Sequence, residues 1–124
     1  DANTATAVAA LAQDTELSPR CNAAEALGSM QSHSEIAVPA LIRLLTDEDG
    51  QTRFNAAYSL ARHRDKAAAA IPALIHALDD ENRYVRNHSV EALEQIGTPA
   101  ARRALYDFLT VSRWCPITTK DSTF

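Results

Sequence analysis

The stretch Ile71–Gly97, IPALIHALDDENRYVRNHSVEALEQIG, decides the fold of this chain. Its apolar residues follow helical spacing on both sides of an acidic turn, so it predicts two short helices. Nearly the same sequence begins 33 residues earlier, where Val38–Ile42 (VPALI) matches Ile71–Ile75 (IPALI). A fixed period of about 20–50 residues indicates a solenoid of stacked repeats. The predicted fold class is therefore all-α, with helix pairs stacked on one another.

Single residues keep this spacing along most of the chain. Leu45 matches Leu78, and Leu60 matches Leu93. One period earlier the series continues with Val8, Ala12, Asp14, Arg20, Ala24 and Leu27. We expect three repeats over about residues 4–31, 35–64 and 67–97 and a half repeat over 98–111. Together they form one repeat domain over residues 1–111, followed by a tail over 112–124.

Serine, proline and glycine residues predict where the helices begin and end. Ser18 is a candidate N-cap with Pro19 at the first helical position, where the missing N–H of proline costs nothing. Gly97 is a candidate C-cap, and Pro99 opens the next helix. The expected helices are Thr4–Gln13, a helix from Ser18 to about Met30, Glu35–Thr46, Gln51–His63, two helices within Ile71–Ile96, and Thr98–Leu109.

Composition and charge exclude several classes of protein. The 124 residues contain only three glycines and no apolar run of about 20 residues, which favours helices and predicts no membrane span. The formal charge of −4 divides into −6 for residues 1–50 (eight acids, two bases) and +2 for residues 51–124 (ten bases, eight acids). Because no basic stripe is present, nucleic acid is the least expected partner.

The start of the chain and its cysteines leave the compartment open. Asp1 is either the first residue after a removed targeting segment or an internal residue of a longer repeat array. A cytoplasmic protein and a processed, exported or imported precursor are both compatible with this start. Cys21 and Cys115 lie at opposite ends of the predicted stack, too far apart for a disulfide, so free thiols are expected.

The repeats resemble a known family. In the third repeat the matching residues are Asp80, Val85, Arg86, Ala92, Leu93 and Gly97; in the second they are Arg53, Ala56, Ala57 and Leu60. In the first they are Arg20, Ala23, Ala24, Ala26, Leu27 and Gly28. This pattern resembles the HEAT-like repeat, specifically the short bacterial type shared with phycobilisome (phycocyanobilin) lyase subunits. The resemblance covers about residues 4–110 and implies a gently curved, right-handed solenoid whose second helices line the concave side.

Acids and arginines at equivalent positions form a ladder of three rungs, with the members Asp14, Asp47, Asp80, Arg20, Arg53 and Arg86. Three acid–base sites would be one interpretation. In the resembling family such residues tie a turn to the neighbouring repeat, and charge-assisted hydrogen bonds suit that role. We therefore interpret the ladder as structural.

Other patterns of catalytic or metal-binding chemistry are missing from the sequence. His33, His63, His76 and His88 share no common spacing, whereas tetrahedral zinc needs clustered ligands. No glycine-rich phosphate loop and no G-x-S-x-G motif is present. We predict no catalytic residue, no metal site and no cofactor, and an enzyme is the less expected class.

The second helices carry the candidate partner-binding residues. Phe54, Tyr58 and Arg62 are each four residues apart, so they share one helix face. Aromatic residues and arginine are the types enriched at binding hot spots. The full candidate set is Phe54, Asn55, Tyr58, Arg62, Tyr84, Asn87, His88 and Glu91. The competing interpretation is that Phe54 packs as ordinary core and His88 is an ordinary surface histidine.

Three functions follow from these observations. The first is a non-catalytic scaffold that binds a protein partner in the groove of the second helices. The second, implied by the resemblance, is an accessory factor of bilin or phycobilisome metabolism that holds a linear tetrapyrrole or a phycobiliprotein near His88. The third is a small subunit of a larger photosynthetic or membrane complex. In the tail, Trp114 and Ile117 either cover the apolar end of the stack or contact another subunit.

Overall fold

The computed structural model describes residues 1–114, with side chains as far as residue 110, and over this range the fold is entirely helical. The α-helices are α1 (Ala2–Leu11), α2 (Leu17–Leu27), α3 (Ser34–Leu44), α4 (Gly50–His63), α5 (Ile71–Ala77), α6 (Arg83–Ile96) and α7 (Pro99–Trp114). Two 3₁₀ segments, η1 (Gln31–His33) and η2 (Arg64–Ala70), join successive pairs. The predicted all-α class is confirmed.

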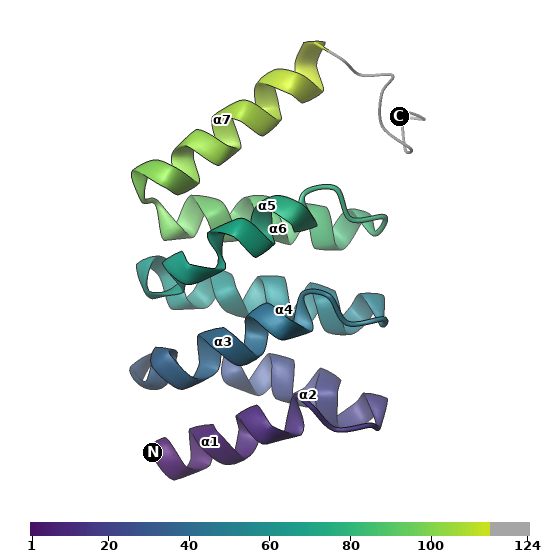
Figure 1. Cartoon of the computed structure of the whole chain (residues 1–124), viewed down its shortest axis with the longest axis vertical. Helices are drawn as coiled ribbons and strands as arrows, with labels where there is room; N and C mark the ends of the chain where they lie inside the picture. The colour runs from purple at the N-terminus through teal and green to yellow at the C-terminus, as the bar shows by residue number, and fades with distance from the viewer. Residues whose placement is uncertain (115–124) are drawn as a thin grey trace.

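The helices stack in two layers along one axis (Figure 1). One layer holds α2, α4 and α6, which contact each other in that order; the other holds α1, α3, α5 and α7. The two ends of the stack are α1 and α7. This arrangement is a solenoid of helix pairs, as the period predicted. No helix within residues 1–114 has the length and apolar character to cross a membrane.

One fully buried leucine from each of the five central helices forms the axis of the core. These residues are Leu27, Leu41, Leu60, Leu74 and Leu93, each with 0% of its surface exposed. Burying a leucine contributes roughly 1.5–3 kcal/mol. Most of the residues packed around them are alanines, which let neighbouring helices approach closely. The repeat period therefore marks the core as well as the topology.

The helix starts differ from the predicted ones by one or two residues, and two of these differences have an identified cause. Helix α1 begins at Ala2, because the Asp1 carboxylate accepts a hydrogen bond from the Thr4 N–H at 2.8 Å. Helix α2 begins at Leu17, so the prediction of Ser18 as N-cap is wrong. The reason is a tight turn in which the Asp14 carboxylate accepts from the Glu16 N–H at 2.8 Å. Because of this turn, the N-cap of α2 is Glu16, two residues before the predicted N-cap Ser18.

The C-terminal half confirms one predicted boundary and moves another. Gly97 ends α6 in the left-handed conformation, with φ of 66°, as a C-cap glycine should. Helix α7 runs to Trp114, past the expected end of the half repeat at residue 111. No glycine or proline interrupts residues 100–115, and Pro116 is the next residue that disfavours helix. The predicted contacts of Trp114 and Ile117 lie outside the described side chains.

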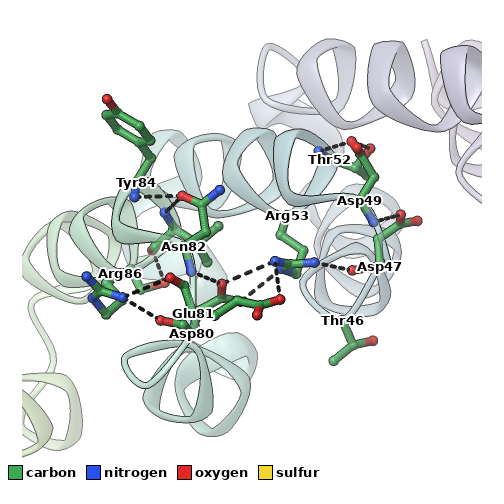
Figure 2. Close-up of polar contacts among 12 residues, drawn as sticks. Thr46, Asp47, Asp49, Thr52, Arg53, Asp80, Glu81, Asn82, Tyr84 and Arg86 are labelled. Carbon is green, nitrogen blue, oxygen red and sulfur yellow. Dashed lines mark hydrogen bonds and ion pairs between the residues drawn. The ribbon is translucent and has the colours of Figure 1, made fainter. Parts of the chain in front are cut away.

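Arginine–aspartate rungs tie each turn to the next pair (Figure 2). Arg53 Nε donates to Asp80 Oδ2 at 2.9 Å, and its Nη1 donates to the carbonyl oxygen of Asp47 at 2.8 Å. Arg20 repeats the pattern one period earlier, with Nε 2.7 Å from Asp47 Oδ2. One guanidinium therefore fixes the carbonyl of its own turn and the carboxylate of the following turn.

At the two ends of the ladder, Arg86 and Asp14 make hydrogen bonds to backbone groups of their own turns. Arg86 Nη1 donates to the Asp80 carbonyl oxygen at 2.7 Å, and the Asp14 carboxylate accepts from the Glu16 N–H. Burial alone would raise the pKa of Asp47, but the hydrogen bonds from Arg20 and from the Asp49 N–H outweigh it and hold that pKa below its ordinary value. Each rung carboxylate is thus committed to a structural hydrogen bond.

A buried histidine joins three helices. His63 at the end of α4 is 2% exposed, and its Nε2 lies 2.8 Å from the carbonyl oxygen of Leu27 in α2. Its Nδ1 lies 2.7 Å from the Ser34 hydroxyl at the start of α3. Since a carbonyl only accepts, Nε2 carries the proton and Nδ1 accepts from Ser34 when the ring is neutral. Burial lowers the pKa of His63, and the positive charges of Arg62 and Lys66 lower it further, against the opposing effect of the Leu27 bond.

We expect the free energy of unfolding to fall as the pH drops below about 7. The pKa of His63 is lower in the folded chain than the ordinary value of about 6.5 that it regains on unfolding. The unfolded chain therefore binds the extra proton first, and the stability is full above that value and decreases as the pH falls toward the folded pKa. Urea unfolding between pH 5 and 8 measures this slope.

Two variants separate His63 from other titrating groups. His63→Gln should flatten the slope, whereas His33→Gln, which changes a histidine outside the core, should keep it. The depressed pKa of Asp47 acts in a lower window, below about pH 5. An equal slope in wild type and His63→Gln would contradict the assignment.

Candidate functional site

The outward residues of α2, α4 and α6 form one face, which we call the second-helix surface. The register between α2 and α4 comes from three hydrogen bonds that join residues 34 to 36 apart. Asn55 Nδ2 donates to the carbonyl oxygen of Cys21 at 3.4 Å, and Ser59 Oγ donates to that of Ala24 at 2.5 Å. The third is the bond of His63 to Leu27. Residues one period apart therefore lie in rows across this surface.

An aromatic cluster occupies the α4–α6 part of this surface. The rings of Phe54 and His88 have centroids 4.6 Å apart, and Tyr58 meets His88 edge to face at 5.4 Å. Tyr84 joins the cluster through Phe54, at 6.2 Å. Such tilted and edge-to-face pairs hold rings in place beyond the effect of buried area. The structure therefore brings four of the eight predicted residues together as one preorganised group.

The two tyrosines of this cluster keep much of their surface in solvent. Tyr58 is 44% exposed and Tyr84 is 57% exposed. Figure 2 shows Tyr84, at the start of α6, pointing away from the turn residues Asp80 and Glu81. Phe54 is only partly buried and packs against the core while also supporting His88. Both interpretations of Phe54 therefore describe part of its environment.

The other four predicted residues lie around the cluster, each with different neighbours. The Asn55 amide is already hydrogen-bonded within the chain: its Nδ2 also donates to Cys21 Sγ at 3.2 Å, and its Oδ1 accepts from Gln51. Glu91 lies 3.3 Å from His88 Nδ1, and Asn87 is exposed beside it. Arg62 is exposed and lines a hollow of about 340 Å³ between α2 and α4. The other residues that line this hollow are Asn22, Glu25, Ala26 and Ser29.

Two features of the structure were missing from the predicted set. Glu25 is the first, although the 33-residue period places it at the position equivalent to Tyr58 and Glu91. The second is a hollow of about 600 Å³ beside the rungs, between the ends of α3 and α5, lined in part by Thr46, Ala73 and His76. No apolar periodicity marks such a hollow, because it arises from the gap between two successive turns.

The acidic side chains of the Arg–Asp rungs are already paired. The rung carboxylates Asp47 and Asp80 are paired with arginines at 2.7 and 2.9 Å. Among residues 1–110 no three His, Cys, Asp or Glu side chains are grouped so that they could hold a metal ion. What the surface does present is exposed aromatic area on a rigid stack, which suits the binding of another molecule.

Comparisons with known proteins identify the repeats. The sequence profile of HEAT repeats matches residues 4–71 and, in a second overlapping match, residues 38–114. No curated protein matches the chain. Among solved structures, an engineered protein determined as a structural-genomics target is similar over 98% of this chain, with 24% identity and a TM-score of 0.71. This chain covers 58% of the length of that protein, and at this identity the likeness concerns the fold alone.

The matches identify the family but not a subtype within it. They support HEAT repeats over nearly all of the described chain and do not confirm the phycobilisome-lyase subtype. HEAT repeats generally serve as protein-interaction scaffolds. The period, the rungs, the two helical layers and the profile match agree, and the chain belongs to the HEAT-repeat family.

Proposed function

We propose that this protein is a non-catalytic scaffold that binds a protein partner on its second-helix surface. The observation that supports the proposal is the aromatic cluster of Phe54, Tyr58, Tyr84 and His88, which spans two consecutive repeats. Isolated surface aromatics are common, but a cluster with two rings about half exposed is not needed to hold this core together. Its area is available to a partner.

The cluster has the properties of a binding centre. Its rings contact each other and Phe54 rests on the core, so a partner would restrict few side-chain rotations on binding. Truncating an aromatic anchor of this kind at the centre of an interface typically costs more than about 1 kcal/mol. Polar groups surround the rings, with Asn87 and Glu91 on α6 and Arg62 on α4. An apolar centre with a polar rim is the usual anatomy of an interface.

The test is affinity capture from the native source with mass spectrometry, followed by binding measurements on variants. Phe54→Ala/Tyr58→Ala should weaken binding of the captured partner roughly 100-fold, because two anchors are lost. Tyr106→Ala is the matched control, since Tyr106 is a 68% exposed tyrosine on α7, away from the second-helix surface. This control should bind as wild type does.

Folding must be checked before these affinities are interpreted. Phe54 packs partly against the core, so the double variant is compared with wild type by circular dichroism and urea unfolding. Tyr58→Ala alone serves as a second variant because its ring lies outside the core, and it should weaken binding about tenfold. A folded double variant with full partner affinity would falsify the proposal.

Two narrower functions remain as alternatives, and the first of them is implied by the family resemblance. An accessory factor of bilin or phycobilisome metabolism would place a tetrapyrrole or a phycobiliprotein on the same surface near His88. A subunit of a photosynthetic or membrane complex would instead contact a neighbouring subunit through its C-terminal tail. A visible absorption band on purification, or phycobiliproteins in the capture, would favour the first. A colourless protein that gains no band when mixed with bilin would count against it.

A further inference from the structure

The N-terminal end of the stack, formed by α1 and the turn that follows it, carries the same residues that lie between repeats inside the stack (Figure 1). Three rows of residues, each with a 33-residue period, show this. The rows are Ala7, Ala40 and Ala73; Leu11, Leu44 and Ala77; and Asp14, Asp47 and Asp80. No helix precedes α1 within residues 1–114, so the first member of each row meets no preceding pair there.

Burial shows which way the leucine row faces. Leu11 is 45% exposed, but Leu44, at the same place in the next repeat, is 2% exposed. Both leucines are followed by a further helix pair, and only Leu44 is also preceded by one. The preceding pair therefore covers this position. The alanine row agrees, since Ala40 is 1% exposed whereas Ala7 is exposed.

The turn of Asp14 has the geometry of a rung without the arginine. The carboxylates of Asp14, Asp47 and Asp80 each accept a hydrogen bond from the N–H two residues later, at 2.8, 2.9 and 2.8 Å. Asp47 and Asp80 also receive the arginine that lies 27 residues earlier in the chain. Asp14 makes no ion pair within the described part of the chain. A preceding pair in the same register would bring an arginine to it.

From these rows we infer that the N-terminal end is a docking surface for one more helix pair of the same repeat type, whose arginine reaches Asp14. Such a pair would cover Leu11 as the pair α1–α2, which packs against α3, covers Leu44. The guanidinium fork fixes the register, and each contact between neighbouring repeats of a linear array adds to stability. This surface is separate from the aromatic cluster, and the inference does not depend on it.

The opposite end of the stack shows that a second copy of this chain does not match the surface. Where one second helix meets the next, α2 has Gly28 against Ser59 of α4, and α4 has Ala61. The equivalent residue of α6 is the exposed Glu94. A following helix at the same spacing would bury this carboxylate without a partner, which is unfavourable. The occupant is therefore a helix pair from outside this sequence, with a small residue at that place.

The test supplies such a pair in a defined register. Residues 34–66 of this chain, which contain α3 and α4, are fused directly before Asp1, so that a second copy of Arg53 lies 27 residues before Asp14. The fused chain should unfold in one urea transition, with an unfolding constant at least about tenfold lower than that of the original chain. A separate transition for the added pair, or an unchanged unfolding constant, would overturn the inference.

Variants of the rung assign the effect to Asp14. Asp14→Asn keeps an acceptor for the Glu16 N–H and removes the charge. It should raise the unfolding constant of the fused chain about tenfold and leave that of the original chain nearly unchanged, because only the fused chain has an arginine there. Arg53→Gln in the added copy should cause a similar loss, and combining the two changes should add little. Equal effects of Asp14→Asn in both chains would overturn the predicted rung.

Two leucines of nearly equal exposure provide the matched control. Leu11→Ser should destabilise the fused chain at least about fivefold more than the original chain, because the added pair covers this residue. Leu17 is 46% exposed, and the equivalent Gly50 lies beside Asn82 of the following repeat, so Leu17→Ser should act equally in both chains. Sedimentation of the original chain at high concentration tests the excluded occupant. A dimer that Leu11→Ser abolishes would place a second copy on this surface and overturn the assignment.

Discussion

Replacing Arg53 with alanine should lower the free energy of unfolding by about 3 kcal/mol. The guanidinium holds the Asp80 carboxylate at 2.9 Å and the Asp47 carbonyl at 2.8 Å, and both charged side chains are nearly buried, with 11% and 12% of their surface exposed. Without Arg53, the Asp80 carboxylate loses its partner in a poorly hydrated place and the carbonyl loses its donor. The midpoint of urea unfolding, monitored by circular dichroism, measures the loss.

Two variants make this result specific to the rung. Arg43→Ala removes an exposed arginine on α3 that has no ion pair within residues 1–110, and it should change stability by no more than about 0.5 kcal/mol. Arg53→Lys should fall between the two, because one ammonium cannot reproduce the fork that reaches both oxygens. If Arg53→Ala is no more destabilising than Arg43→Ala, the rungs do not stabilise the stack.

Gly28→Ala should cost about 2 kcal/mol, although alanine is normally the better helix former. A Cβ at Gly28 would lie 2.6 Å from Ser59 Oγ, 2.9 Å from its Cβ and 3.1 Å from its Cα, so α2 and α4 would have to separate. This is the crossing where Ser59 Oγ donates to the carbonyl oxygen of Ala24 at 2.5 Å. Moving the helices apart would weaken that bond as well.

Gly50→Ala is the matched control for the close contact. A Cβ at Gly50 would meet Asn82 Nδ2 at 2.9 Å; this atom ends a side chain, so it can give way by a small shift while Oδ1 continues to accept from the Tyr84 N–H. We expect a change within about 0.5 kcal/mol in either direction. Adding Ser59→Gly to Gly28→Ala should give a double variant less destabilised than the sum of the single changes. Simple additivity would place the cause elsewhere.

The repeated parts of the fold were predictable because each has a local signal. Leu27, Leu60 and Leu93 keep one period, and burial of an apolar face explains that period directly. The arginines and aspartates of the turns were interpreted as structural because the resembling family uses such residues to tie a turn to the neighbouring repeat. The structure adds their direction: Arg20 pairs with Asp47, in the next repeat, and not with Asp14. Sequence spacing alone does not distinguish a bond within a turn from a bond to the next one.

Other features depend on packing that has no local signal. The alanines of η2 fit a helix continuing from either neighbour, and the 3₁₀ segment follows from how Ala67 and Ala70 are buried. At the aromatic cluster, spacing placed Phe54 and Tyr58 on one face of α4. It could not determine that His88 lies between their rings, because that contact is set by the separation of α4 and α6.

The direction of the rungs has a consequence for how the chain opens. Arg53 belongs to α4, yet its carboxylate partner precedes α6, so the free energy of this bond belongs to the border between two repeats. When one of these repeats unfolds, the repeat that is still folded loses its hydrogen-bond partner. In a linear array, strong borders of this kind make neighbouring units open together. Hydrogen exchange should therefore report one shared opening rate for α2, α4 and α6.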